Sequence, residues 1–389
     1  MNNKVKILVA SLAVGMAATL TGCGGCFGCA GCGGNSKSHT LTRSNWFTGT
    51  SYGGIQPSFI EGHEHFSKEE ITYTVSYDGT NAVNSNYSVN YKDGEFKTEF
   101  YAKEYDWKSS AIPEGYAPEK AGKEIVYYYR TELTISVQYT LKVGDKAQSK
   151  WFDDHVITES CFRAAGKSLQ PVYSKQSIVS TSPASYQPTK LEDTYKEINV
   201  EYENFYDYNC TRVLSKTTDY TKDDPTLDRI GDGVVQSKEY GKLHKLDYTL
   251  FDNSSLYIAV RSMKLSTNLS EPVNLFSAAA GNIDGYSIVG SEAALTLQEI
   301  SDYTAALSQK GLYVSSGEDD NGVAATAVTI SYAGGNLRGT SQTVWYASIL
   351  NNDNNISRAT MLKLSVPISF SLGTLNYSLK EVNSTLWNG

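Results

Sequence analysis

The sequence has few of the residues, and none of the short motifs, on which many enzymes depend. Its 389 residues include only 5 His, 9 Pro and 4 Met. It contains no G-x-S-x-G nucleophile elbow, no G-x-x-x-x-G-K-S/T phosphate loop and no H-E-x-x-H zinc motif. These absences argue against an elbow-type hydrolase, a P-loop nucleotidase and a zincin, and we expect no cofactor.

Basic charge is also scarce, because 34 Lys and Arg face 42 Asp and Glu and give a net charge of −8. Binding to nucleic acid requires a basic surface, so we expect no nucleic-acid partner. In contrast, the sequence is rich in aromatic residues, with 28 Tyr and 12% aromatics overall. Tyrosine favours half-buried, pleated surfaces, and this composition therefore predicts a β-rich globular protein.

The N-terminal segment has the pattern of an export signal. Lys4 and Lys6 precede an uncharged, mostly apolar run from 7 to 20, which is too short for a membrane span and fits the core of a signal peptide. The Leu20–Cys23 tetrapeptide, Leu-Thr-Gly-Cys, then resembles the lipobox of bacterial membrane lipoproteins. This resemblance implies cleavage before Cys23 and attachment of a diacylglycerol to its thiol, so that acyl chains anchor the protein.

The resemblance divides the chain into a signal peptide (1–22), a Cys- and Gly-rich tether (23–38) and a β-rich body (39–389), with a possible subdivision near 220–235. It places the protein at the outer side of a bacterial cell membrane. Cys23, Cys26, Cys29 and Cys32 follow one another at a spacing of three. Only two residues separate the last two of these cysteines, whereas the iron–sulfur pattern has three at that place. We therefore expect the cysteines after Cys23 to be thiols of a tether and not ligands of a cluster.

The body alternates between apolar and polar residues in the manner of β-strands. Residues 71–77, 87–91 and 125–143 have this period of two or are rich in β-branched and aromatic residues. Asp93-Gly94 predicts a hairpin between its flanking strands, and Gly144-Asp145 predicts another. Residues 362–372 alternate again, with Pro367 marking an edge or a bend.

Two other segments differ from this pattern. Ser291–Lys310 has near-helical apolar spacing and predicts a helix packed on the sheet, and Ser174–Lys190 predicts a loop. A Thr-Ile-Ser triplet precedes a Trp at nearly equal distance in 134–151 and 329–345, which allows two related halves. The predicted fold is mainly β, a curved antiparallel sheet or half-barrel with about one packed α-helix.

Three segments resemble strands of bacterial half-barrel proteins of the lipoprotein-carrier type: Ser168–Ile178, Phe251–Ser262 and Gly373–Val382. This resemblance implies a concave sheet that binds acyl chains.

Two cysteines, Cys161 and Cys210, lie in the body. An extracytoplasmic compartment permits a disulfide between them, while two buried free thiols are the alternative.

Metal sites have only weak candidates. His63 and His65 would project to one face of a strand and could chelate a metal, or they belong to a polar loop. Asp228, Asp232 and Glu239 fall where a calcium loop of the EF-hand type has its ligands, but an apolar residue occupies one ligand position. The alternative is a charged turn.

The aromatic residues have two interpretations. The run Tyr127–Tyr129 puts rings on both faces of one strand, where they form a core or bind a ligand, and we favour the core. We expect a non-catalytic, lipid-anchored protein that binds an amphipathic ligand or an envelope component, with lipid, glycan or envelope protein as candidate partners. The alternative is a structural or adhesive surface protein that contacts partner proteins. A carboxylate-based hydrolase is the third hypothesis and requires two converging acids.

Overall fold

The computed structural model describes residues 68–165, 168–222, 226, 228–241, 243, 250–261, 270–278, 282–295, 312–314, 318–319, 322–332, 341–351, 357–368 and 372–384. The predicted signal peptide and tether, with Cys23, and the pair His63 and His65 lie outside these residues. None of the helices in the described part has the length and hydropathy of a membrane span.

The described residues form strands almost throughout. The strands are β1 (Lys68–Gly79), β2 (Tyr87–Tyr91), β3 (Gly94–Asp106), β4 (Lys123–Val143), β5 (Lys146–Ala165), β6 (Ser168–Pro183), β7 (Tyr195–Tyr206), β8 (Arg212–Asp219), β9 (Arg229–Ile230), β10 (Gly233–Gly241), β11 (Leu250–Asp252), β12 (Ser270–Ser277), β13 (Asn282–Leu295), β14 (Leu312–Val314), β15 (Glu318–Asp319), β16 (Gly322–Tyr332), β17 (Ser341–Asn351), β18 (Ser357–Ile368) and β19 (Gly373–Ser384). The short helices are η1 (Leu191–Asp193), η3 (Asn253–Ser255) and α2 (Leu256–Arg261).

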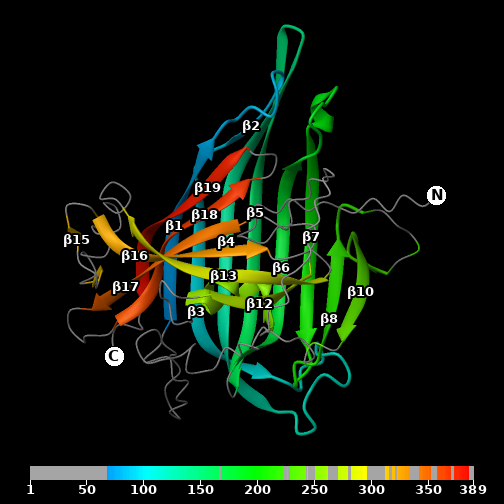
Figure 1. Cartoon of the computed structure of the whole chain (residues 1–389). Coiled ribbons are helices and arrows are strands. Elements are labelled where there is room, and N and C mark those ends of the chain that lie inside the picture. Colours follow the sequence, from blue (N-terminus) through cyan, green and yellow to red (C-terminus); the bar gives the residue numbers. More distant parts are fainter. Residues whose placement is uncertain are drawn as a thin grey trace, which may run out of the picture.

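All strands belong to one curved sheet, in which β11 and β12 are parallel and the other pairings are antiparallel. The first half runs from β3 through β4, β5, β6, β7 and β8 to β10, and β1 joins it to β19 and the second half. In Figure 1 the long strands of the first half stand upright, and β12 and β13 cross in front of them. This arrangement confirms the predicted fold class.

The apolar alternation of the strands explains how the sheet curls around a core. In β1 the side chains of Ile71, Tyr73 and Val75 are buried, while the residues between them are half-buried or exposed. The eight largest fully buried side chains are six Tyr and two Phe. Tyr127 and Tyr129 belong to the main core and Tyr128 to a second cluster on the opposite face of β4. The prediction that these rings form core is confirmed.

The predicted helix at Ser291–Lys310 is wrong over its first turn. Residues up to Leu295 continue β13, which pairs in register with β16 from Tyr286↔Tyr332 to Leu295↔Val323. The local helical spacing yields to this cross-strand pairing. The remaining residues of the predicted helix lie outside the described part of the chain.

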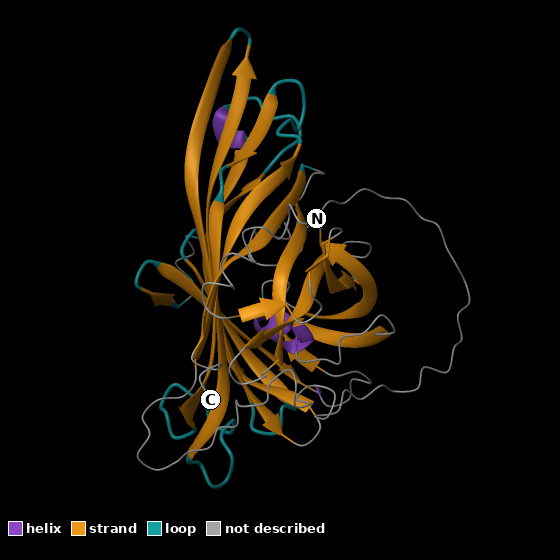
Figure 2. Ribbon diagram, turned by 90° about the vertical axis from the view of Figure 1, so that its left-hand side faces the viewer, coloured by secondary structure: helices purple, strands orange, loops and turns teal. Residues whose placement is uncertain are grey.

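A helix occurs instead in the segment Phe251–Ser262, which we expected to be a strand. The Asp252 side chain accepts a hydrogen bond from the Ser254 amide at 2.8 Å and begins the turn that leads into α2. Asp-Asn-Ser-Ser is a capping sequence, so the signal for this helix was present. Figure 2 shows the helix on the inner side of the curved sheet.

The predicted hairpin at Asp93-Gly94 is also wrong. Both β2 and β3 pair with the same strand β4, through Tyr91↔Val137 and Glu95↔Thr134, so the chain continues in one direction with a one-residue bulge. A Cβ at Gly94 would lie 2.4 Å from the Thr134 carbonyl oxygen. Glycine is therefore needed here for close approach of two strands and not for a turn.

The hairpin at Gly144-Asp145 is confirmed, because Val143 pairs with Lys146 and Gly144 has a positive φ of 61°. The predicted loop at Ser174–Lys190 is wrong as far as Pro183, since β6 pairs with both β5 and β7 along this stretch.

Candidate functional site

The concave face of the sheet is occupied by the chain itself. All six residues of α2 are buried, and Leu256, Tyr257 and Ile258 join the main core. Arg261 at the end of α2 forms a bidentate ion pair with Glu69 of β1, and the second contact, Nη2 to Oε2, is 2.9 Å. Both side chains are buried, with 5% and 2% exposure. The pair holds the helix against the first strand.

Asp252 is the second buried acid on this face. One carboxylate oxygen accepts hydrogen bonds from the Ser174 hydroxyl at 2.6 Å and from the Tyr206 hydroxyl at 2.5 Å. Burial raises the pKa of the Asp252 carboxyl, and the hydrogen bonds oppose this rise. Asp252 is the last residue of β11, whereas Ser174 lies in β6 and Tyr206 in β7. Its hydrogen bonds therefore hold β11 against the first half of the sheet.

Asp154 is the third buried acid and lies on the same face of β5. Its carboxylate accepts hydrogen bonds from the Ser180 hydroxyl at 2.8 Å, the Thr181 amide at 3.0 Å and the Thr181 hydroxyl at 3.1 Å. Burial raises the pKa of Asp154 to about 7 in spite of these donors. The carboxyl is therefore poised to exchange a proton near neutral pH.

Each of these three acids, Glu69, Asp154 and Asp252, has its own structural partners. Within the described ranges, no group of three or more His, Cys, Asp and Glu is arranged to hold a metal ion. The chemistry of this face is therefore that of a packed interior with buried hydrogen bonds.

The opposite face of the sheet carries a row of alternating charge. Cross-strand partners follow one another in register from β3 to β8, and these six residues, the ionic row, are Glu99, Arg130, Glu159, Lys175, Glu203 and Lys216. All are half-buried. Opposite charges directly across strands stabilise a sheet, and the row contains three acids and three bases. The ionic row itself is therefore polar and nearly neutral.

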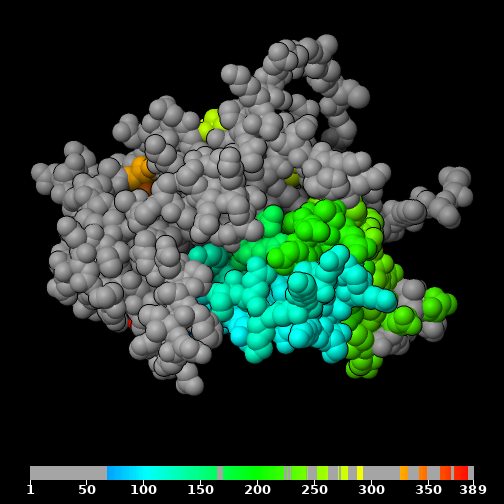
Figure 3. Space-filling view, turned by 90° about the horizontal axis from the view of Figure 1, so that it is seen from below, coloured from blue at the N-terminus to red at the C-terminus, as the bar shows by residue number. Residues whose placement is uncertain are grey.

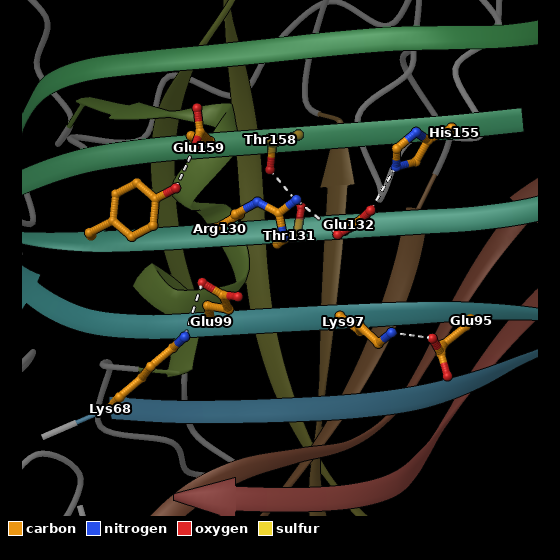
Figure 4. A network of polar contacts seen from close by, with 11 residues as sticks. Lys68, Glu95, Lys97, Glu99, Arg130, Thr131, Glu132, His155, Thr158 and Glu159 are labelled. Atoms are coloured by element: carbon orange, nitrogen blue, oxygen red, sulfur yellow. Dashed lines mark hydrogen bonds and ion pairs between the residues drawn. The ribbon is translucent and has the colours of Figure 1, made fainter. Parts of the chain in front are cut away.

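The ionic row and its neighbours also make contacts along a strand and diagonally between strands (Figure 4). Arg130 contacts Glu132 at 2.8 Å, and His155 bonds the other oxygen of Glu132 at 2.7 Å. Lys68 reaches Glu99 at 3.5 Å, and the Tyr128 hydroxyl donates to Glu159. His155 and its neighbour Asp154 point to opposite faces, as alternation along a strand requires.

A row of mostly aromatic residues runs parallel to the ionic row. It consists, in register, of Tyr101, Tyr128, Cys161, Tyr173 and Phe205. The ring centroids of Tyr101 and Tyr128 are 4.8 Å apart and those of Tyr173 and Phe205 are 5.3 Å apart.

Residues 107–122, the lower cap, cover part of this row. Trp107 and Tyr116 of the cap are buried. The Tyr208 amide donates to the Tyr116 carbonyl at 2.9 Å, and Arg212 donates to the Gly115 carbonyl at 2.7 Å. Figure 3 shows the cap, in cyan, beside the green residues of later strands.

The two body cysteines do not form a disulfide in the structure. Cys161 is a buried free thiol and Cys210 a half-buried one. Burial raises the pKa of Cys161 to about 11 and that of Cys210 to about 12. Thiols of this kind are inert at neutral pH and pack as small apolar groups.

The predicted calcium ligands lie in a hairpin and do not surround a common point. Asp228 precedes β9, and its carbonyl accepts from the Val235 amide of β10. Glu239 lies four residues further along β10, about 13 Å at the rise of a strand. There it accepts from the Tyr116 hydroxyl at 2.7 Å and lies 3.5 Å from Arg212. The segment from 228 to 239, with Asp232 in its turn, is thus a charged β-turn region.

Sequence reasoning missed the residues that organise the interior: Glu69, Asp154, Asp252 and Arg261. Asp154 stands between Asp153 and His155, which are exposed and half-buried, and nothing in the local sequence distinguishes it from them. The strand alternation is the signal that could have found it, because it puts Asp154 in phase with Val156.

Comparison with known proteins gives little that bears on function. No family model and no curated protein matches the chain. One solved structure, a β-barrel-like protein of a domain of unknown function from Brucella abortus, is similar with a TM-score of 0.37 and 10% identity, covering 82% of this chain and 98% of that chain.

Proposed function

We propose that this protein is a non-catalytic, lipid-anchored protein of the bacterial envelope that holds an envelope component on its outer surface. The observation that carries the proposal is the occupied concave face. α2, the pair Glu69–Arg261 and the bonds of Asp252 fill the place where a half-barrel carrier would hold its ligand. Binding at the surface is therefore favoured over binding of an acyl chain inside.

The partners of the three described acids on the concave face support a binding role over hydrolysis. The Asp154 and Asp252 carboxylates accept hydrogen bonds from neutral hydroxyls and amides, and Glu69 is paired with an arginine. Retaining glycosidases need two carboxyls about 5 Å apart, and the described interior offers each acid a separate structural role.

The anchor is tested by changing the lipobox cysteine. We expect Cys23→Ala to move the protein from the membrane fraction to the soluble extracytoplasmic fraction, because it removes the thiol that carries the diacylglycerol. Cys26→Ala changes a neighbouring cysteine of the tether and is the control, with full retention expected. Unchanged retention of Cys23→Ala would show that the anchor lies elsewhere.

The binding role is tested by native mass spectrometry of the full chain, extracted gently from the membranes of its own host. We expect a copurifying lipid, glycan or envelope protein. A bare protein mass under all conditions would favour the alternative, a structural or adhesive surface protein that contacts partner proteins.

A further inference from the structure

A cleft of 490 Å³ opens at the upper end of the sheet, at the start of β2 and the end of β4. Two segments border the cleft. Residues 83–86 directly precede β2, and residues 186–188 follow β6. Its volume lies within the range of small-ligand sites. We propose that this cleft binds an uncharged sugar unit of an envelope glycan, an inference that rests on the proposed function and specifies its ligand.

The residues that line the cleft include three apolar side chains and one aromatic residue. The apolar side chains are those of Val83, Leu141 and Pro188, of which Leu141 is buried and the other two are half-buried. The aromatic residue, Tyr186, is 51% exposed. A pyranose has an apolar face of C–H groups that stacks on an aromatic ring, and an exposed tyrosine offers such a surface with few rotatable bonds.

The described rim of the cleft is polar and uncharged. Asn86 and Gln187 are exposed there, and the described lining residues include no Asp, Glu, Lys, Arg or His. An amide side chain both donates and accepts, which matches a sugar hydroxyl, itself a donor and an acceptor. An anionic or cationic ligand would find no counter-charge among these residues, so the chemistry of the rim favours a neutral glycan.

Hydrogen bonds hold the two bordering segments together without a ligand. The Asn84 amide oxygen accepts from the backbone amides of Asn86 and Tyr87 at 2.8 Å each, and its nitrogen donates to the Tyr186 carbonyl. Lys142 donates its backbone amide to the Asn86 carbonyl at 2.7 Å. A site fixed in this way loses little conformational entropy when it binds.

The test is calorimetric titration of the full chain, in a detergent that contains no sugar, with neutral oligosaccharides of glucose, galactose, mannose or N-acetylglucosamine. We expect at least one to bind saturably. Tyr186→Ala should weaken this binding about tenfold or more, and Tyr186→Phe should retain it, because stacking needs the ring. Tyr220→Ala, at another exposed tyrosine (39%), is the matched control and should have no effect.

Three results would overturn the inference: no neutral sugar binds, Tyr186→Ala binds as tightly as the wild type, or a uronic-acid oligosaccharide or an uncharged peptide binds better. Native mass spectrometry distinguishes a failure of the sugar-binding inference from a failure of the proposed function. If wild type and Tyr186→Ala retain the same copurified envelope component, the proposed function stands and the cleft is not its site.

Discussion

Asp154 is a buried carboxyl whose raised pKa predicts that the stability of the protein depends on pH. Its donors are neutral hydroxyl and amide groups, so its negative charge is stabilised by hydrogen bonds while burial opposes ionisation. Tyr91 and Tyr139 lie near enough for the charge of Asp154 to raise their pKa values further, in addition to the larger effect of their own burial. Ionisation of Asp154 is thus unfavourable for this region of the core.

We expect Asp154 to lower the free energy of unfolding as pH rises from about 4 to about 7. Its pKa is about 7 in the folded protein and about 4 in the unfolded chain, so the folded state binds more protons between these values. In urea titrations, the free energy of unfolding of the wild type should decrease between pH 5 and pH 8 by on the order of a few kcal/mol. Asp154→Asn should not show this decrease. Asp153→Asn, at the exposed neighbouring carboxyl, is the control. An identical pH dependence for wild type and Asp154→Asn would contradict the assignment.

At the scale of the element, the sequence predicts strands better than it predicts their partners. The alternation in 71–77, 87–91 and 125–143 correctly locates β1, β2 and β4. The pairing of β2 with β4, and not with β3, depends on contacts of high sequence separation that no local pattern contains. Likewise Ala293 and its neighbours suit a helix or a strand, and β16 decides between the two.

The bulge at Gly94 gives a prediction for the joint between β2 and β3. Gly94→Ala should destabilise the protein by about 1–3 kcal/mol, because the added Cβ would lie 2.4 Å from the Thr134 oxygen and 3.0 Å from the Ile135 Cβ. Gly122→Ala makes the same chemical change at a position with no heavy atom within 4 Å of the added carbon. Thermal unfolding of both variants tests this, and equal melting temperatures would refute the close approach.

At the scale of the whole molecule, the sequence predicts the curved β architecture and an aromatic core but not the way in which the interior is filled. The sequence before α2 identifies its capping residues. Their burial, however, depends on the position of β11 and β12 across the concave face. The cleft beside Tyr186 joins loops that are far apart in the chain, so its residues form no motif.

The pair Glu69–Arg261 tests whether α2 is an integral part of the interior. Glu69→Gln leaves the Arg261 charge buried without its counter-ion and should cost about 3–5 kcal/mol in urea unfolding. The double variant Glu69→Leu with Arg261→Met removes both charges and should recover much of this loss. Glu104→Gln, in an exposed pair with Lys123, should change stability by less than about 1 kcal/mol. A cost for Glu69→Gln as small as that of Glu104→Gln would place the ion pair at the surface.

The pairing of β1 with β19 has a consequence for the time course of folding. Ser76 and Asn376 are register partners although they lie 300 positions apart. A ribosome or an export channel releases β1 first and β19 last, and closing so long a loop is slow. Until β19 emerges, one edge of β1 remains unpaired and can recruit strands of other chains. Protection of that edge is therefore needed until β19 is released.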